Sequence, residues 1–301
     1  MNKIFRLFTD RKFRFSVMSA RGLYNWMPDK KFLETKFKIQ MGKKLNLDNP
    51  KTFNEKLQWL KLYDRNPLYT TLVDKYAVRQ YIKDTIGEEY LIPLVGGPWK
   101  TFDEIDFDAL PDQFVLKCTH DSGGLVICRD KSKLDKEKAR RKIEKCLKTN
   151  YYYGNREWPY KNVPPQIIAE KYMTDTLTTE LRDYKFFCFD GMVKALFIAT
   201  ERANETEETK FDFFDENFQH LPFTNGHPNA AKLPEKPKSF ELMKELAAKL
   251  SKGIPHVRVD FYEVDEKVYF GELTFFHWSG LVPFNPPEWD QKVGDWITLQ
   301  K

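Results

Sequence analysis

Three charged residues near the C-terminal end have the types and the spacing of a metal-nucleotide site. Arg258 and Asp260 alternate with apolar residues in Val257-Arg-Val-Asp-Phe-Tyr, so they share one face of a predicted strand. With a turn at 265–267, Asp260 lies directly opposite Glu272 on the next strand. Facing carboxylates repel each other, and Mg²⁺, which prefers one or two carboxylates with phosphate oxygens and water, offsets that repulsion. The alternative is a solvent-facing hairpin that carries unrelated charges.

A lysine within an apolar strand is the second candidate. Lys117 lies in Phe114-Val-Leu-Lys-Cys, and Thr119-His-Asp-Ser-Gly-Gly follows it. A buried ammonium is costly without an anion beside it, and adjacent glycines let backbone amides approach a phosphate closely. The pattern predicts a phosphate-binding loop, unless the lysine reaches solvent.

Two weaker candidates lie elsewhere in the chain. Glu170-Lys-Tyr-Met directly follows an apolar strand, where backbone groups can bind an adenine edge and Tyr or Met its face. Asp74-Lys75 opens a predicted helix, from which Lys75 reaches a phosphate held by the opposite domain. Most helical lysines are simply solvated.

The elements that position these residues change character along the chain. Residues 15–90 have the apolar spacing of helices, one of them with a capping box formed by Thr52 and Glu55. Residues 90–99, broken by Pro and Gly, predict a short strand that runs into a loop. Further strands are predicted from 113 onward, with a helix at 133–148, a strand at 166–170, a hairpin turning at Asp190-Gly191, a helix at 239–252 and a hairpin at 256–276. The order predicts an α+β fold that begins with helices.

The composition excludes several classes of protein. A chain of 301 residues with 41% hydrophobic residues and 25 Phe predicts two compact domains. Four Cys without CxxC spacing indicate neither zinc nor a redox dithiol. No apolar run is long enough to cross a bilayer and no nucleic-acid motif is present, so a cytoplasmic protein that binds no nucleic acid is expected.

The first fifty residues are strongly basic. They hold 12 Lys and Arg against 4 Asp and Glu, or +8, whereas the remaining 251 residues sum to −3. The stretch from Met1 to Phe8 interleaves bulky apolar groups with cations and is followed by Arg11, Lys12 and Arg14, which is typical of an interfacial helix. Peripheral contact with the inner face of the plasma membrane is one interpretation. A first helix packed on a core, or a solvated basic face, is the other.

Taken in order, these pieces resemble the nucleotide-binding series of the ATP-grasp superfamily. The Glu-Lys-Tyr-Met turn resembles the hinge of biotin carboxylase, and Arg-Val-Asp-Phe the strand of D-alanine:D-alanine ligase. More narrowly, the chain is similar to the TupA-like branch over residues 15–296, through Asn54-Glu-Lys-Leu-Gln-Trp-Leu, Asp74-Lys-Tyr, Val115-Leu-Lys-Cys, Arg258-Val-Asp-Phe-Tyr and Gly271-Glu-Leu-Thr-Phe. The resemblance implies an ATP-grasp fold with a helical region at 1–110 and two α+β subdomains, 111–170 and 171–301, that clamp ATP.

The resemblance also implies roles for individual residues. Lys117 and Arg258 would be catalytic, and Mg²⁺ would be held by Asp260, Glu272 and Thr274, although Thr274 stands where most of the superfamily has Asn, which puts a second metal in doubt. ATP would be contacted by Lys75, Lys117, Asp121, Ser122, Gly123, Gly124, Glu170, Lys171, Tyr172, Lys185 and Arg258. The second substrate would be contacted by Arg182, His277, Trp278 and Ser279.

The implied reaction is ATP-dependent ligation in the synthesis of bacterial surface polysaccharide. A carboxylate of a glycan or sugar acid, such as a uronic acid, becomes an acyl phosphate and then forms an amide with an amine or amino acid, with His277 or Asp183 as a base. A glycosyltransferase is the main rival, because Asp106-Phe-Asp108 has the DxD spacing of a nucleotide-sugar site. Two further rivals are a sugar or lipid kinase and a polysaccharide-binding protein without catalysis.

Overall fold

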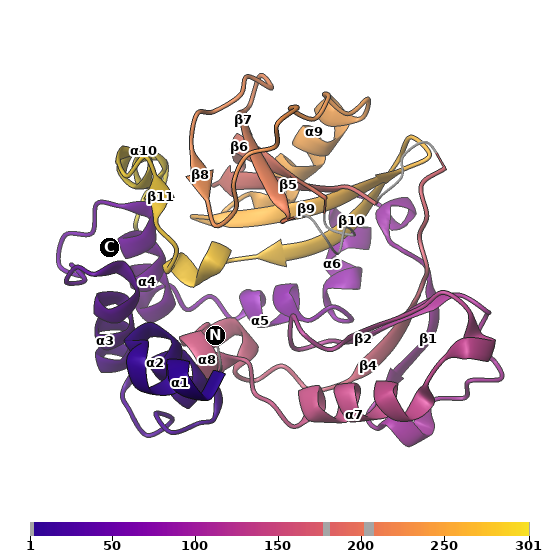
Figure 1. The fold of residues 1–301 in the computed structure, drawn as a ribbon. Coiled ribbons are helices and arrows are strands. Elements are labelled where there is room, and N and C mark those ends of the chain that lie inside the picture. The colour runs from indigo at the N-terminus through magenta and orange to yellow at the C-terminus, as the bar shows by residue number, and fades with distance from the viewer. Residues whose placement is uncertain (1–2, 177–180, 202–207, 301) are drawn as a thin grey trace.

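Two antiparallel sheets, one above the other, form the body of the chain (Figure 1). The computed structural model describes residues 3–176, 181–201 and 208–300. The helices are α1 Lys3–Thr9, α2 Arg11–Ala20, α3 Asp29–Met41, α4 Phe53–Tyr63, α5 Leu68–Val73, α6 Val78–Thr85, α7 Lys136–Leu147, α8 Tyr152–Asn155, α9 Phe240–Ser251 and α10 Glu288–Asp295, with short 3-10 helices at 88–90, 102–104, 131–133, 158–160 and 277–280. None of the helices in these ranges is both long and apolar enough to cross a membrane.

The larger sheet has the strand order β10-β9-β5-β6-β7. Its strands are β5 Asp183–Phe189, β6 Met192–Thr200, β7 Lys210–Asp215, β9 Val257–Val264 and β10 Lys267–Thr274. Helix α9 covers one face, where Phe186 of β5 packs against Phe240 of α9 and Phe261 of β9. This apolar face leaves Arg258 and Asp260 on the opposite face, as the alternation in the sequence predicts.

The smaller sheet has the order β1-β4-β2-β3. It is formed by β1 Leu94–Trp99, β2 Phe114–Cys118, β3 Leu125–Cys128 and β4 Ile167–Lys171, and a further two-stranded sheet pairs β8 Thr224–Asn225 with β11 Phe284–Asn285. Helix α7 packs on the smaller sheet, and every second residue of β2 is buried in the core that they share. Lys117 is therefore on the other face of β2.

The predicted elements are largely confirmed. The capping box of Thr52 and Glu55 begins α4, and the hairpins at 190–191 and 256–276 form as predicted. Strand β1 confirms the short strand predicted within 90–99, and it joins the smaller sheet through β4. The division into regions 1–110, 111–170 and 171–301 stays a prediction.

Two local predictions were wrong. The hairpin of β9 and β10 turns on two residues, Asp265 and Glu266, with left-handed φ of 48° and 64°, rather than on three. A bulge at Gly271 restores the predicted register, so Glu272 still lies opposite Asp260. Lys75 does not lie in a helix, because the Asp74 carboxylate accepts backbone hydrogen bonds from Tyr76 and Ala77 and holds a turn between α5 and α6.

Candidate functional site

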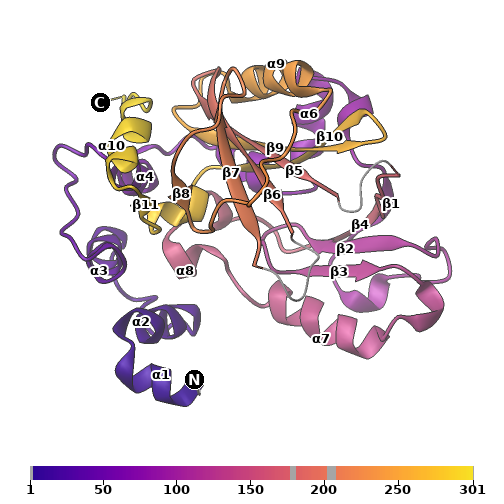
Figure 2. The same cartoon turned by 45° about the horizontal axis from the view of Figure 1, so that its top comes forward.

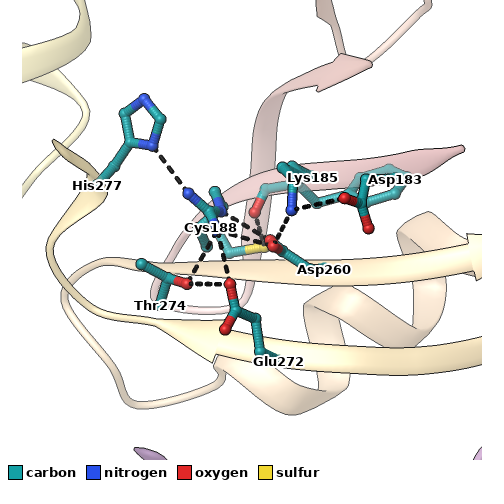
Figure 3. Close-up of polar contacts among 9 residues, drawn as sticks. Asp183, Lys185, Cys188, Asp260, Glu272, Thr274 and His277 are labelled. Atoms are coloured by element: carbon teal, nitrogen blue, oxygen red, sulfur yellow. Dashed lines mark hydrogen bonds and ion pairs between the residues drawn. The ribbon is translucent and has the colours of Figure 1, made fainter. Parts of the chain in front are cut away.

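A buried arginine on β9 is the centre of the charged cluster. Arg258 donates two parallel hydrogen bonds to Asp260, each 2.7 Å long. The same guanidinium donates to Thr274 Oγ1 at 3.0 Å and to Glu272 Oε1 at 3.1 Å on β10. Figure 3 shows Asp260 of β9 with Glu272 and Thr274 of β10 gathered on one face of the sheet. The structure thus brings the three predicted metal ligands around one cation.

A second cation meets Asp260 from β5. Lys185 is in register with Asp260 and donates to its carboxylate, and Asp183 lies 3.5 Å from the same ammonium (Figure 3). Burial raises the pKa of Asp260, but the positive charges of Arg258 and Lys185 outweigh burial and hold that pKa below its usual value. Asp260 is therefore a carboxylate, and two cations neutralise it.

His277 supports Arg258 from the other side. Burial and the neighbouring Arg258 charge hold the pKa of His277 well below its usual value, so the ring is neutral. Its Nδ1 lies 2.9 Å from Arg258 Nη1 and accepts a hydrogen bond from it. The neutral ring therefore carries its hydrogen on Nε2, which donates to Asn225 Oδ1 at 3.0 Å. Since both ring nitrogens are engaged, the geometry makes His277 a positioning residue rather than a base for an amine.

The smaller sheet contributes a lysine and a glutamate. Lys117 Nζ lies 2.5 Å from Glu170 Oε2, and Arg79 Nη1 of α6 lies 3.8 Å from the other oxygen of that carboxylate. These residues line a pocket between the sheets together with Lys75 and Glu272. The pocket's apolar lining includes Leu72, Val73, Val78, Leu91, Phe270 and Leu273. The cations suit phosphate groups, the carboxylates suit a metal ion that accompanies those phosphates, and the apolar wall suits a nucleotide base.

The loop between β2 and β3 is tied to Lys75. The Lys75 ammonium donates a hydrogen bond to the backbone carbonyl of Asp121. The backbone N–H of Lys75 donates to the carbonyl of Thr119 at 3.1 Å. Burial lowers the pKa of Lys75 against the opposing charges of Glu272 and Asp121. The loop is closed by a hydrogen bond of 2.9 Å from Gly124 N–H to Asp121 Oδ1, which leaves Ser122 and Gly123 exposed.

Three predicted contacts lie apart from this cluster. They are Lys171, Tyr172 and Arg182. Glu170 lines the pocket between the sheets, but the next two residues, Lys171 and Tyr172, line a different hollow. There Tyr172 accepts a hydrogen bond from Arg129 at 3.2 Å. Burial raises the pKa of Tyr184 to about 12, and the Arg182 charge opposes this shift. Arg182 is thus a neighbour of Tyr184, and no contact in the described ranges joins it to Asp260.

The loop after β10 is held by helix α4. Trp278 and Ser279 have left-handed φ of 49° and 56°, a costly conformation for residues other than glycine. The Ser279 carbonyl accepts from Gln58 at 2.9 Å and from Lys61 at 2.8 Å, and the Ser279 hydroxyl donates to Glu157. These bonds fix a strained turn next to His277.

Sequence reasoning missed the residues that hold this loop. Gln58 and Lys61 are polar residues at buried positions of α4, and that mismatch between polarity and position was a readable signal. Nothing near Asn225, Glu157 or Arg79 marked them in the sequence, because their partners are more than 50 residues away.

The cluster holds the oxygen donors that magnesium prefers, and a metal ion would have to displace a cation from the Asp260 carboxylate to bind there. Asp260, Glu272 and Thr274 present hard oxygen atoms on two paired strands, and Mg²⁺ needs only one or two carboxylates when phosphate oxygens complete its shell. The described ranges contain no group of three or more His, Cys, Asp and Glu residues that could hold a metal ion. A metal here would therefore depend on the phosphates of a nucleotide.

The chain is similar to known proteins in sequence and in fold. The family model described as TupA-like ATPgrasp matches residues 55–298. D-alanine–D-alanine ligase from Bacillus anthracis is 15% identical, with a TM-score of 0.43 over 88% of this chain and 83% of that chain. The enzyme from Helicobacter pylori is also 15% identical, with a TM-score of 0.43 over 81% and 68%.

A more distant solved structure is the biotin carboxylase domain of Hydrogenobacter thermophilus 2-oxoglutarate carboxylase, in complex with MgADP. It is 18% identical, with a TM-score of 0.38. The match covers 68% of this chain and 40% of the carboxylase chain. The search of curated proteins found no match. At these scores the fold assignment rests on the family match.

Proposed function

The chain belongs to the TupA-like ATP-grasp family, and on this premise we propose that it is an ATP-dependent carboxylate–amine ligase. The observation that carries the proposal is the Arg258 cluster on one sheet beside a pocket to which the other sheet contributes Lys117. Two lysines, one arginine and two carboxylates in one place suit phosphoryl transfer, which asks a protein mainly for positioning and charge neutralisation.

The proposed reaction has two steps. A carboxylate oxygen of the acceptor attacks the γ-phosphorus of ATP, the bond from that phosphorus to the β–γ bridging oxygen breaks, and ADP leaves with the electron pair. An amine nitrogen then attacks the acyl carbon, the bond to phosphate breaks, and the nitrogen loses a proton. The products are an amide, ADP and inorganic phosphate.

The chain's own residues have distinct tasks in this proposal. Lys75 and Lys117 bind the phosphates, which would draw Lys117 from Glu170 and free that carboxylate for the adenine edge. Arg258 holds the transferring phosphoryl group and is kept in place by Asp260 and His277. Bound by Asp260, Glu272 and Thr274, Mg²⁺ would supply charge neutralisation at the phosphates.

We place the second substrate at the loop 277–280. Trp278 is 40% exposed; its ring stacks on the buried Phe211 at 6.1 Å and 22°, and it lies tilted beside His227 at 5.8 Å and 44°. An exposed ring such as that of Trp278 suits the apolar face of a sugar. We propose a uronic acid of a bacterial surface polysaccharide or its precursor as the carboxylate, an amino acid or amino sugar as the amine, and the cytoplasm, where ATP is supplied, as the site of the reaction.

The test is trapping of the activated carboxylate. The protein is incubated with Mg-ATP, a panel of uronic acids and UDP-uronic acids, and hydroxylamine as amine. Phosphate release is measured by a coupled assay and the hydroxamate by mass spectrometry. We expect both to require a particular uronic acid and to be lost in Lys117→Met, while Lys133→Met, at an exposed position, keeps them. ADP with a phosphorylated sugar and no free phosphate would make the protein a kinase instead.

A further inference from the structure

Exposed apolar side chains concentrate at one end of the chain. Among the large apolar residues of the described ranges, four of the five most exposed lie between residues 5 and 26. They are Phe8 at 77%, Trp26 at 75%, Phe5 at 57% and Leu23 at 52%. The other member of the five is Met192 at 53%. Large exposed aromatic groups clustered in one short segment mark an interaction surface.

The same segment carries a large excess of positive charge. Residues 3–31 hold eight Lys and Arg against two Asp, a net charge of 8 − 2 = +6. Both acids are already paired, Asp10 with Arg6 at 3.0 Å and Asp29 with Arg156 at 3.2 Å. The exposed charges of the segment are therefore cations, namely Arg11, Lys12, Arg21, Lys30 and Lys31.

The fold presents this segment outward. Helix α2 is anchored by Phe15, which packs with Phe32 and Tyr24 in a small core, and α1 packs on α2. Phe5 and Phe8 are three residues apart on α1, so they share one side of that helix. Figure 2 shows α1 at the outer end of the molecule, beyond α2 and α3 from the two sheets. A partner can reach α1 while the pocket between the sheets stays open.

The chemistry of this surface fits a bilayer that contains anionic lipid. Helices that lie in the membrane interface combine bulky apolar groups, which enter the boundary of the acyl chains, with Lys and Arg, which bind the headgroups. α1 and α2 have 7 and 10 residues, so they lie along such a surface and do not cross it. We propose that α1, α2 and the segment 21–31, which includes the start of α3, form a basic, aromatic surface that binds an anionic lipid bilayer peripherally.

This inference is independent of the proposed ligase activity and is tested without it. The full-length protein is sedimented with vesicles of phosphatidylcholine that contain 0 or about 30% phosphatidylglycerol, at 0.1 and 0.5 M salt, where the Debye length falls from about 10 Å to below 5 Å. We expect binding that requires phosphatidylglycerol and weakens at high salt. Equal binding to both vesicles, or none to either, overturns the proposal.

Matched variants locate the surface. Phe5→Ser with Phe8→Ser is compared with Met192→Ser with Leu242→Ser, two exposed apolar residues on the body of the molecule. Arg11→Glu with Lys12→Glu is compared with Lys133→Glu with Lys238→Glu, two exposed lysines elsewhere. Each cation near the surface is worth about fivefold in affinity, so the first charge pair should lose at least about 25-fold.

The variants also decide between partners. All four double variants change exposed residues, so we expect their melting temperatures to stay near that of the wild type. The proposal fails if the body variants lose as much vesicle binding as the α1 and α2 variants. It also fails if analytical ultracentrifugation shows a dimer that only Phe5→Ser with Phe8→Ser dissociates, because the occupant would then be a second copy of the chain.

Discussion

The loop between β2 and β3 leaves no room for a side chain at Gly124. A Cβ at this position would lie 2.5 Å from Cys118 Sγ and 2.6 Å from Cys118 Cβ, well inside the normal contact distance of about 3.5–4.0 Å. The Gly124 carbonyl accepts from Cys118 N–H at 2.7 Å, and its N–H donates to Asp121, so the backbone is held on both sides. Gly124→Ala should therefore displace the loop, at a cost of about 1–3 kcal/mol in the free energy of unfolding.

The neighbouring glycine provides the matched control. A Cβ on Gly123 meets nothing nearer than Asp121 Oδ2 at 3.8 Å, so Gly123→Ala should be neutral or stabilising by up to about 1 kcal/mol. Urea unfolding followed by circular dichroism measures both variants, and calorimetric titration measures their affinity for Mg-ATP. A Cys118→Gly background, which removes both clashing atoms, should restore part of the loss in Gly124→Ala. Equal stability of the two alanine variants would refute the reasoning.

Three further predictions concern the buried charges. Burial lowers the pKa of His256 to about 3, so the unfolded chain takes up its proton first as the pH falls below about 6.5. Stability should then fall by up to about 1.4 kcal/mol per pH unit more in the wild type than in His256→Leu, as urea unfolding from pH 6.5 to 4.5 would show. Lys61→Met should lower the free energy of unfolding by about 3–5 kcal/mol because the buried Glu157 loses a counter-charge. Adding Glu157→Gln should recover part of this loss. A double variant that is no more stable than Lys61→Met would contradict the charge interaction between Lys61 and Glu157. Arg258→Lys keeps the charge but loses the planar fork that bonds Asp260 and His277, so phosphate release should fall at least about 100-fold and the melting temperature should fall as well, whereas full activity would remove Arg258 from the mechanism.

Local patterns in the sequence predicted much of this site. Alternation along residues 257–261 places Arg258 and Asp260 on one face, because side-chain direction in a strand depends only on position. Lys117 on the less buried face of β2 follows from the same rule. The capping box of Thr52 and Glu55 needs only residues that are neighbours in the chain.

The remainder depends on contacts that no local pattern encodes. Lys185 meets Asp260 only because β5 pairs with β9 in one particular register. The bulge at Gly271 shifts the pairing of β10 with β9 by one residue, and a glycine in a strand does not by itself show that the strand bulges there. His277 has the type of a catalytic base, and only the positions of Arg258 and Asn225 reveal that both of its nitrogens are engaged.

The central claim is that the pocket between the two sheets binds Mg-ATP, and thermal stabilisation tests it most directly. Melting is measured with Mg-ATP, with Mg-ADP and with a panel of UDP-sugars, for the wild type and for Glu272→Gln. At about 100 times its dissociation constant a ligand adds about 2.7 kcal/mol of stability. Stabilisation by Mg-ATP that weakens in Glu272→Gln is the predicted result. Stabilisation by a UDP-sugar alone, with none from Mg-ATP, would contradict the account and favour a glycosyltransferase.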